Sequence, residues 1–245
     1  MTQLQGRAIV VTGGAAGIGL ACVEALVSAG ADVVVGDIDA DGVRAVCDRL
    51  GCEGVVADVS KAAEAVSIVA AAERAFGRLD GLVAAAGTFD GGSIADVDPD
   101  RFAEVLAVNL TGVFLVAQAA LEAMRKSGGG GRIITIGSLS SQTGGLAAGA
   151  AYTASKGGVM ALTKSIARHG GPLGVTANCV IPGIIDTAIT QAWSDDSLER
   201  MVEATPLGRT GTPAEIAALV AFLLSDAAAF VTGAHIDANG GLYMS

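Results

Sequence analysis

The sequence predicts a single α/β domain spanning residues 1–245, in which a doubly wound, mostly parallel sheet of seven strands carries helices on both faces. Short β-branched runs alternate with longer alanine-rich stretches along the chain, as expected for repeated strand–helix units. Most of these runs are apolar at successive positions, which is typical of parallel strands covered on both faces. Hydrophobic residues make up 51% of the chain and aromatic residues only 4%, so small aliphatic side chains must fill the layers.

Seven segments are expected to form the strands. In chain order they cover residues 7–12, 32–37, 54–58, 81–85, 132–137, 175–181 and 234–237. One helix has a clear beginning, because Thr212, Pro213 and Glu215 supply a hydroxyl at the N-cap, proline at the first position and a carboxylate at the third. The apolar stretch that follows extends to Leu224, and the glycine run 128–131 predicts a loop.

The formal net charge of −10 and the isoelectric point near 4.5 argue against attraction to nucleic acid or to an anionic membrane surface. We therefore expect no nucleic-acid partner and no membrane partner. Strictly apolar runs such as 217–224 are far shorter than the roughly 20 residues that cross a bilayer. No export signal is visible before the first strand, so a cytoplasmic location is predicted.

No metal site is predicted. The four cysteines lack C-x-x-C spacing and are interpreted as reduced core residues, and the two histidines, His169 and His235, stand at unrelated places. A metal site would need carboxylates from distant parts of the chain.

A glycine-rich segment, TGGAAGIG, separates the first expected strand from a helical stretch. Glycines at this point, Gly13, Gly17 and Gly19, would allow a tight turn and a close approach of the backbone to a pyrophosphate at the positive end of the helix. A glycine-rich turn without a ligand is the alternative. The strand before it, the helix after it and an acidic residue downstream favour the dinucleotide-binding, Rossmann-fold interpretation.

That acidic residue is Asp37, which ends the second expected strand about 20 residues beyond the loop. Its carboxylate can accept hydrogen bonds from ribose hydroxyls and would repel a 2′-phosphate. No lysine or arginine occurs in residues 13–19 or at Ile38, so nothing near the loop would neutralise that phosphate. The predicted cofactor is therefore NAD. The alternative role for Asp37, capping of the next helix, suits Asp39 and Asp41 better.

Tyr152 and Lys156 are four residues apart at the start of a helical segment and therefore share one helix face. Lowering a phenol pKa from about 10 towards neutral pH requires roughly 3–4 kcal/mol. An ammonium about 4 Å away supplies about 4 kcal/mol at an effective dielectric constant of about 20. Tyr152 would then accept an alcohol proton while hydride leaves the same carbon, with Ser138 steadying the substrate oxygen. Alone, the pair would be interpreted as an ordinary surface pair; the nucleotide loop favours the catalytic role.

These residues resemble the short-chain dehydrogenase/reductase family over essentially the whole chain. TGGAAGIG is similar to the family's T-G-x-x-x-G-x-G loop, YTASK to its Y-x-x-x-K motif, and IPGIIDT to its P-G-x-x-x-T motif. VNLTGVF contains its helix asparagine, and PLGRTGTPAEIAALVAFLLS with VTGAHIDANGG resembles its C-terminal portion. The resemblance implies an oxidoreductase that exchanges a hydride between NAD(H) and a secondary alcohol or ketone.

The same resemblance implies the roles of single residues. Tyr152 is the acid/base, with Lys156 as its electrostatic partner and a ribose ligand. Ser138 is the ligand of the substrate oxygen, and Asn109 joins through a water relay. The residues expected to contact the dinucleotide are Gly13, Gly17, Ile18, Gly19, Asp37, Ile38, Asp58, Val59, Gly87, Tyr152, Lys156, Pro182, Ile185 and Thr187.

Three departures from the family pattern are visible. Ala85 stands where the family commonly has asparagine, so altered packing near the cofactor is expected. The interval from Ser138 to Tyr152 is one residue longer than the commonest one, which leaves Ser140 as a rival for the serine role. Asn239 replaces the aspartate of a common D-G-G motif, and we have no functional account of that exchange.

The substrate is not fixed by the sequence. Residues 184–208 resemble the family's variable substrate lid, and its apolar residues either line a pocket or pack against the body: Ile189, Trp193, Met201 and Val202. Residues 139–151 are expected to supply further wall. The acidic residues Asp195, Asp196, Glu199 and Glu203 disfavour a highly anionic substrate, although such a run is usually a solvated face.

Three functions are compared. The favoured one is an NAD-dependent dehydrogenase that acts on a small-molecule secondary alcohol or ketone. A 3-oxoacyl-thioester (acyl-carrier-protein) reductase that uses NADPH is the nearest alternative, and a non-catalytic dinucleotide-sensing protein is the alternative of another class. Because members of the family commonly form tetramers through the helix that carries Tyr152, a homotetramer is expected.

Overall fold

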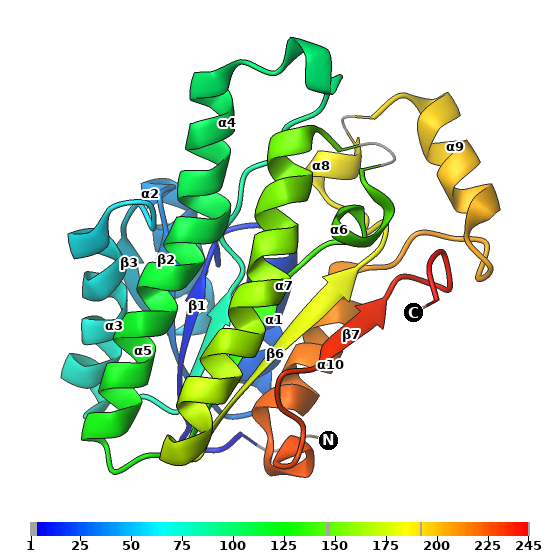
Figure 1. The fold of residues 1–245 in the computed structure, drawn as a ribbon. Helices are drawn as coiled ribbons and strands as arrows, with labels where there is room; N and C mark the ends of the chain where they lie inside the picture. The colour runs from blue at the N-terminus through cyan, green and yellow to red at the C-terminus, as the bar shows by residue number, and fades with distance from the viewer. Residues whose placement is uncertain (1–3, 146–147, 192, 245) are drawn as a thin grey trace.

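The computed structural model describes residues 4–145, 148–191 and 193–244, and its strands form one seven-stranded sheet (Figure 1). The strand order is β3-β2-β1-β4-β5-β6-β7, and every neighbouring pair is parallel. The strands are β1 (Ala8–Thr12), β2 (Asp32–Asp37), β3 (Glu53–Val56), β4 (Gly81–Ala84), β5 (Gly131–Ile136), β6 (Val175–Pro182) and β7 (His235–Ala238). The seven predicted strands are confirmed to within two residues, and the sheet is parallel throughout rather than mostly parallel.

Helices cover both faces of the sheet, as predicted (Figure 1). One face is covered by α3 (Ala62–Phe76), α5 (Gly112–Lys126) and α7 (Ala150–Gly170), and the other by α1 (Gly17–Ser28), α2 (Ala40–Leu50) and α10 (Pro213–Leu224). Further helices lie in the connections: α4 (Pro99–Leu106), α6 (Ser140–Thr143), α8 (Ala188–Gln191) and α9 (Asp195–Ala204). Short turns complete the chain: η1 (Ile94–Asp96), η2 (Ala107–Thr111), η3 (Gly171–Leu173) and η4 (Asp226–Ala228).

Alternate residues of a strand serve the two layers. In β1, Val10 belongs to the core beneath α3, α5 and α7, whereas Ile9 and Val11 belong to the core beneath α1, α2 and α10. All three side chains are buried, and full burial of such a side chain contributes about 1.5–3 kcal/mol. The unbroken apolar runs of the sequence follow from this burial on both faces.

The predicted start of α10 is confirmed. The Thr212 side chain accepts the N–H of Glu215, and the Glu215 carboxylate accepts the N–H of Thr212 at 2.8 Å, which completes a capping box. Asp39 caps α2 by accepting the N–H of Asp41 at 3.2 Å, so the capping role that competed for Asp37 belongs to Asp39.

The helical stretch Pro99–Lys126 joins α4, the π-helical turn η2 and α5. At 28 residues and a mean hydropathy of 1.7 over its most apolar part, it is long and apolar enough to cross a membrane by length and composition. Polar residues interrupt this stretch, so it contains no long strictly apolar run in the sequence. Val113, Val116, Ala120 and Met124 of α5 are buried against the sheet and α3, so packing in the core accounts for its apolar character.

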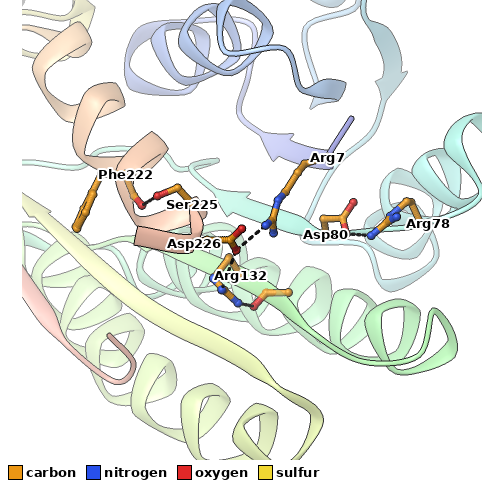
Figure 2. A network of polar contacts seen from close by, with 8 residues as sticks. Arg7, Arg78, Asp80, Arg132, Phe222, Ser225 and Asp226 are labelled. Carbon is orange, nitrogen blue, oxygen red and sulfur yellow. Dashed lines mark hydrogen bonds and ion pairs between the residues drawn. The ribbon is translucent and has the colours of Figure 1, made fainter. Parts of the chain in front are cut away.

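Polar contacts connect the amino ends of the central strands at one end of the sheet (Figure 2). Arg7, just before β1, and Arg132, in β5, both reach the carboxylate of Asp226, at 2.6 and 3.6 Å. Asp80, just before β4, accepts the N–H of Ala8 at 2.9 Å. These contacts hold β1, β4 and β5 in register at the end of the sheet opposite to their carboxyl ends.

The sheet order reverses next to β1. The chain first adds β2 and β3 on one side of β1 and then crosses to place β4 on the other side. The loops that follow β1 and β4 diverge from this point, and in open parallel sheets such a switch point leaves a crevice at the carboxyl ends of the strands. The candidate site lies there.

Candidate active site

The loop between β1 and α1 depends on glycine. A Cβ atom on Gly19 would lie 2.0 Å from the carbonyl oxygen of Gly13, and one on Gly13 would lie 2.6 Å from the Cα of Ala86. Gly13 and Gly17 also have φ values of +68° and +53°, a region that favours glycine. Ala16 at the N-cap of α1 offers no side-chain acceptor, so the first N–H groups of this helix are available to an anion in the crevice.

A crevice of about 1570 Å³ runs along this loop. Most residues predicted to contact the dinucleotide line it: Gly13, Gly17, Ile18, Gly19, Asp37, Ile38, Asp58, Val59, Gly87, Tyr152, Lys156 and Thr187. Pro182 and Ile185 instead line an adjoining cleft, which also contains Ile18, Tyr152 and Thr187. The residues that line the crevice, the glycine loop and the uncapped helix fit a dinucleotide.

Asp37 is held by the backbone on both sides. One carboxylate oxygen accepts the N–H of Ala15 in the glycine loop at 3.0 Å, and the other accepts the N–H of Asp39 at 3.1 Å. Lys156 is the only lysine or arginine among the described residues that line the crevice. Further along, hydrogen bonds from Ser60 hold the pKa of the Asp58 carboxyl below its usual range.

The crevice and the cleft meet at Tyr152, in the first turn of α7. The Tyr152 phenol lies beside the side chain of Ser138, which follows β5 and lines the same cleft. Lys156, one helical turn further, is only 4% exposed, and its Nζ lies 5.6 Å from the centre of the Tyr152 ring. The structure therefore brings three of the four predicted catalytic residues to one place.

The predicted lowering of the Tyr152 pKa is wrong for this structure. Burial raises the pKa of the Tyr152 phenol, and the hydrogen bond with Ser138 offsets only part of that effect. The Lys156 ammonium donates to the backbone carbonyl of Ile136 at 2.9 Å instead of reaching the phenol, and burial lowers the pKa of Lys156 to about 8. The helix spacing is right, but it does not determine where the flexible lysine side chain points.

Ser138 and Ser140 form a pair. Both the hydroxyl and the backbone N–H of Ser140 donate to the Ser138 hydroxyl oxygen, at 2.9 and 3.2 Å. Ser138 lies next to Tyr152, with Ser140 on its other side. Ser140 therefore fixes the position of the Ser138 hydroxyl, and the assignment of Ser138 to the substrate oxygen stays a prediction.

Asn109, the fourth predicted catalytic residue, is fully buried in the π-helical turn η2. Its side-chain oxygen accepts the N–H of Thr88 at 2.8 Å, and its amide group donates to the carbonyl of Thr88 at 2.9 Å and to the hydroxyl of Ser155 at 3.1 Å. The side chain thus joins the loop after β4 to α7. Its place in a water relay stays a prediction.

The surroundings of two of the departures from the family pattern are visible in the structure. At the position after Ala85, the N–H of Ala86 is directed to the hydroxyl of Thr12 at 3.4 Å. Asn239 closes the C-terminal turn, because its side chain accepts the N–H of Gly241 at 3.0 Å and donates to the carbonyl of Tyr243 at 2.9 Å.

A largely apolar cleft of about 750 Å³ opens beside Ser138 and Tyr152. Three of the four apolar lid residues line it, namely Ile189, Trp193 and Met201, whereas Val202 is outside the lining set. The predicted wall 139–151 contributes Leu139, Ser140, Thr143 and Ala148; residues 146–147 lie outside the described residues. Among the described lining residues there is no aspartate, glutamate, lysine, arginine or histidine.

Sequence reasoning missed the segment formed by Thr88, Phe89 and Asp90. The Phe89 ring lines the cleft, with its centre 5.1 Å from that of Tyr152 and 6.4 Å from that of Trp193. Asp90 accepts the backbone N–H of Tyr152 at 2.7 Å. One signal was available: the residue at the N-cap of α7 is Gly149, which has no side chain to cap the helix.

In the part of the chain that the structure describes, no three histidine, cysteine, aspartate or glutamate side chains are grouped to hold a metal ion. His169 and His235 each contact a backbone carbonyl instead, those of Ser165 and Met160.

Comparison with known proteins identifies the family. A family model described as "Enoyl-(Acyl carrier protein) reductase" matches residues 13–243. A crystal structure from Brucella melitensis, titled "Short-chain dehydrogenase/reductase SDR:Glucose/ribitol dehydrogenase", superimposes with a TM-score of 0.94 at 35% identity, covering 100% of this chain and 99% of the other. The chain belongs to the short-chain dehydrogenase/reductase family. It is therefore an oxidoreductase with a nicotinamide dinucleotide cofactor that acts on CH–OH or carbonyl groups.

Curated relatives of this short-chain dehydrogenase/reductase carry different activities in their names. The 3-oxoacyl-[acyl-carrier-protein] reductase of Escherichia coli is 38% identical over 244 residues, 99% of each chain. The 2-(S)-hydroxypropyl-CoM dehydrogenase 3 of Xanthobacter autotrophicus is 40% identical over 251 residues, 98% of each chain. Both likenesses extend over the whole fold.

Proposed function

We propose that the protein is an NAD(H)-dependent dehydrogenase that interconverts an uncharged secondary alcohol and its ketone. The observation that carries this proposal is the meeting of Tyr152, Ser138 and Lys156 where the dinucleotide crevice joins an apolar cleft. An alcohol oxygen placed at the Tyr152 hydroxyl would have its carbon beside the crevice.

The proposed mechanism assigns one task to each side chain. Ser138 donates a hydrogen bond to the substrate oxygen, and the Tyr152 hydroxyl takes the proton of the alcohol during oxidation and returns it during reduction. Lys156 supplies a positive charge beside Tyr152 and a donor for ribose hydroxyls. When bound, the nicotinamide ring accepts or gives the hydride.

The preference for NAD over NADP is proposed from Asp37. Its carboxylate is fixed by the N–H groups of Ala15 and Asp39, where a 2′-phosphate would meet a like charge. The adjoining Ile38 is 70% exposed and carries no charge that could neutralise a phosphate.

Replacement of Asp37 by alanine is expected to relax the discrimination between the two cofactors. The change removes like-charge repulsion but adds no cation, so kcat/KM with NADP should rise about tenfold without tight NADP binding. Steady-state kinetics of the parent and of Asp37→Ala with both cofactors measure this effect. Equal kcat/KM for NAD and NADP in the parent would refute the assignment.

The choice of an uncharged substrate rests on the cleft, whose described lining residues include no charged side chain. A charged ligand would lose its hydration there without gaining a partner. A screen of NAD reduction across polyols, cyclic alcohols, hydroxysteroids and hydroxyacyl thioesters tests this choice. Turnover restricted to anionic alcohols would contradict it.

A 3-oxoacyl-thioester reductase that uses NADPH is the second candidate. The names of relatives that match over the whole chain favour it, whereas Asp37 and the net charge of −10 disfavour NADPH and an acidic carrier. Turnover of a 3-oxoacyl thioester with NADH and with NADPH separates the two candidates. A strong preference for NADPH would favour the reductase.

A non-catalytic dinucleotide sensor is the candidate of another class. It would bind NADH without turning over any member of the substrate panel, and it would have no use for the Ser138–Tyr152 contact. We also propose a homotetramer and a cytoplasmic location, from the resemblance and the composition respectively. Sedimentation of the purified protein tests the first and fractionation of cells the second.

A further inference from the structure

We propose that Asp90 is a positioning residue for Tyr152: it caps the helix that carries the tyrosine from a loop 62 positions earlier in the chain. This inference rests on the proposed acid/base role of Tyr152. It concerns the chain's own geometry and does not involve the cofactor.

The helix α7 lacks a cap of its own. Its N-cap is Gly149 and its first two residues are alanines, so no nearby side chain accepts its first N–H groups. The helices α2, α4 and α10 carry caps of their own, from Asp39, Asp98 and Thr212, whereas α1 and α3 have no side-chain cap. On α7, the carboxylate of Asp90 accepts the N–H of Tyr152 at 2.7 Å. Tyr152 is the third helical residue, whose N–H an N-cap side chain often takes.

A second contact shows that the helix start is shaped for Asp90. The backbone carbonyl of Asp90 accepts the N–H of Gly149 at 2.9 Å. A Cβ atom on Gly149 would lie 2.5 Å from the other carboxylate oxygen of Asp90. Glycine at the N-cap therefore removes the local cap and makes room for the distant one.

The segment that carries Asp90 is itself anchored. Both backbone groups of Thr88 bond to the side chain of Asn109, at 2.8 and 2.9 Å. Arg101 donates to the carbonyl of Phe89 at 3.0 Å, and the Phe89 ring lies 5.1 Å from the Tyr152 ring at a tilt of 59°. Residues 88–90 thus hold Tyr152 by its backbone and by its ring.

These contacts affect the reaction through the position of the Tyr152 phenol. Asp90 is absent from the described lining of both the crevice and the cleft, so it acts through Tyr152 rather than on the substrate. If the first turn of α7 shifts, the phenol moves relative to Ser138. Misplacement of a reacting group by about 1 Å can cost about a hundredfold in rate.

The test compares Asp90→Ala with Asp90→Asn on the best alcohol found by the substrate screen. Asp90→Ala is expected to lower kcat about ten- to a hundredfold, with KM and the Kd of NADH within about threefold. Asp90→Asn keeps an oxygen acceptor and should restore kcat to within about threefold of the parent. Hydrogen exchange in the peptide that contains Tyr152 should be roughly tenfold faster in Asp90→Ala, a readout that needs no turnover.

Thr212→Ala is the matched control, because it removes the side-chain cap of another helix, α10. Thr212 is outside the described lining of both the crevice and the cleft. It should lower Tm as much as Asp90→Ala does while leaving kcat unchanged. Parent kcat in Asp90→Ala, unchanged exchange at Tyr152, or an equal loss of kcat in Thr212→Ala would each overturn the proposal. A failure of the proposed function would appear differently, as parent turnover in Tyr152→Phe.

Discussion

Replacement of Tyr152 by phenylalanine is expected to lower kcat for alcohol oxidation by about 10²–10⁴-fold, the range that a positioned proton-transfer group contributes. In the parent, the rings of Tyr152 and Phe89 lie 5.1 Å apart between their centres, and a phenyl ring can keep this contact. The variant loses only the hydroxyl beside Ser138. The Kd of NADH should therefore stay within a few-fold of the parent value. Stopped-flow turnover and fluorescence titration with NADH measure the two quantities.

The control for this variant is Tyr243→Phe, which changes the other tyrosine of the chain, near the C-terminus. Tyr243 is outside the described lining of both cavities, and kcat should not change. Unchanged turnover in Tyr152→Phe would remove the phenol from the mechanism.

Replacement of Gly19 by alanine is expected to be the most damaging change in the nucleotide loop. The new Cβ atom would lie 2.0 Å from the carbonyl oxygen of Gly13, a backbone atom that cannot move without the loop. We expect a loss of about 3 kcal/mol or more in the free energy of unfolding, at the upper end of what overpacking costs. The Kd of NADH should rise roughly tenfold or more, because the N–H groups of the loop lose their arrangement.

Gly171→Ala serves as the comparison for Gly19→Ala. Gly171 has no heavy atom within 4 Å of an added Cβ atom and no positive φ, so its replacement should change stability by less than about 0.5 kcal/mol. Chemical denaturation and NADH titration of both variants make the measurement. Parent stability and affinity in Gly19→Ala would show that the loop tolerates a side chain, against the close approach proposed for it.

The regular parts of the fold follow from local patterns. Buried strands such as β1 are apolar at consecutive positions because Ile9, Val10 and Val11 face two different cores. The α10 cap and the glycine loop lie within a few consecutive residues, so the sequence could predict them. The helix Pro99–Lys126 shows the limit of such local patterns, since polar residues, among them the buried Asn109, interrupt its apolar run.

The parts of the site that the sequence missed depend on contacts between distant segments. The cap of α7 comes from Asp90, and a search near Gly149 could only notice that a cap was missing. The four-residue spacing of Tyr152 and Lys156 places both on one helix face, yet the ammonium points to the carbonyl of Ile136. The direction of the Tyr152 pKa shift depends on that orientation and on burial, and neither quantity is local.

The proposed function requires the Tyr152 phenol to exchange a proton with the substrate beside a bound nicotinamide. Burial raises the pKa of this phenol, so its ionisation near neutral pH would require positive charge beside it, which the Lys156 ammonium and an oxidised nicotinamide would supply. Oxidation requires the phenolate, and its kcat/KM should rise with pH until the phenol has ionised. Reduction requires the neutral phenol and should slow over the same range.

Ultraviolet difference titration of the NAD⁺ complex, with Tyr152→Phe as the reference that leaves only Tyr243, measures this ionisation directly. We expect the pKa of the Tyr152 phenol in this complex to lie below the unperturbed value of about 10. Its ionisation should fall in the same pH range as the rise in kcat/KM. The opposite result is a Tyr152 phenol that stays protonated up to about pH 10 in the complex while alcohol oxidation proceeds at neutral pH. That result would exclude the phenol as the group that takes the proton.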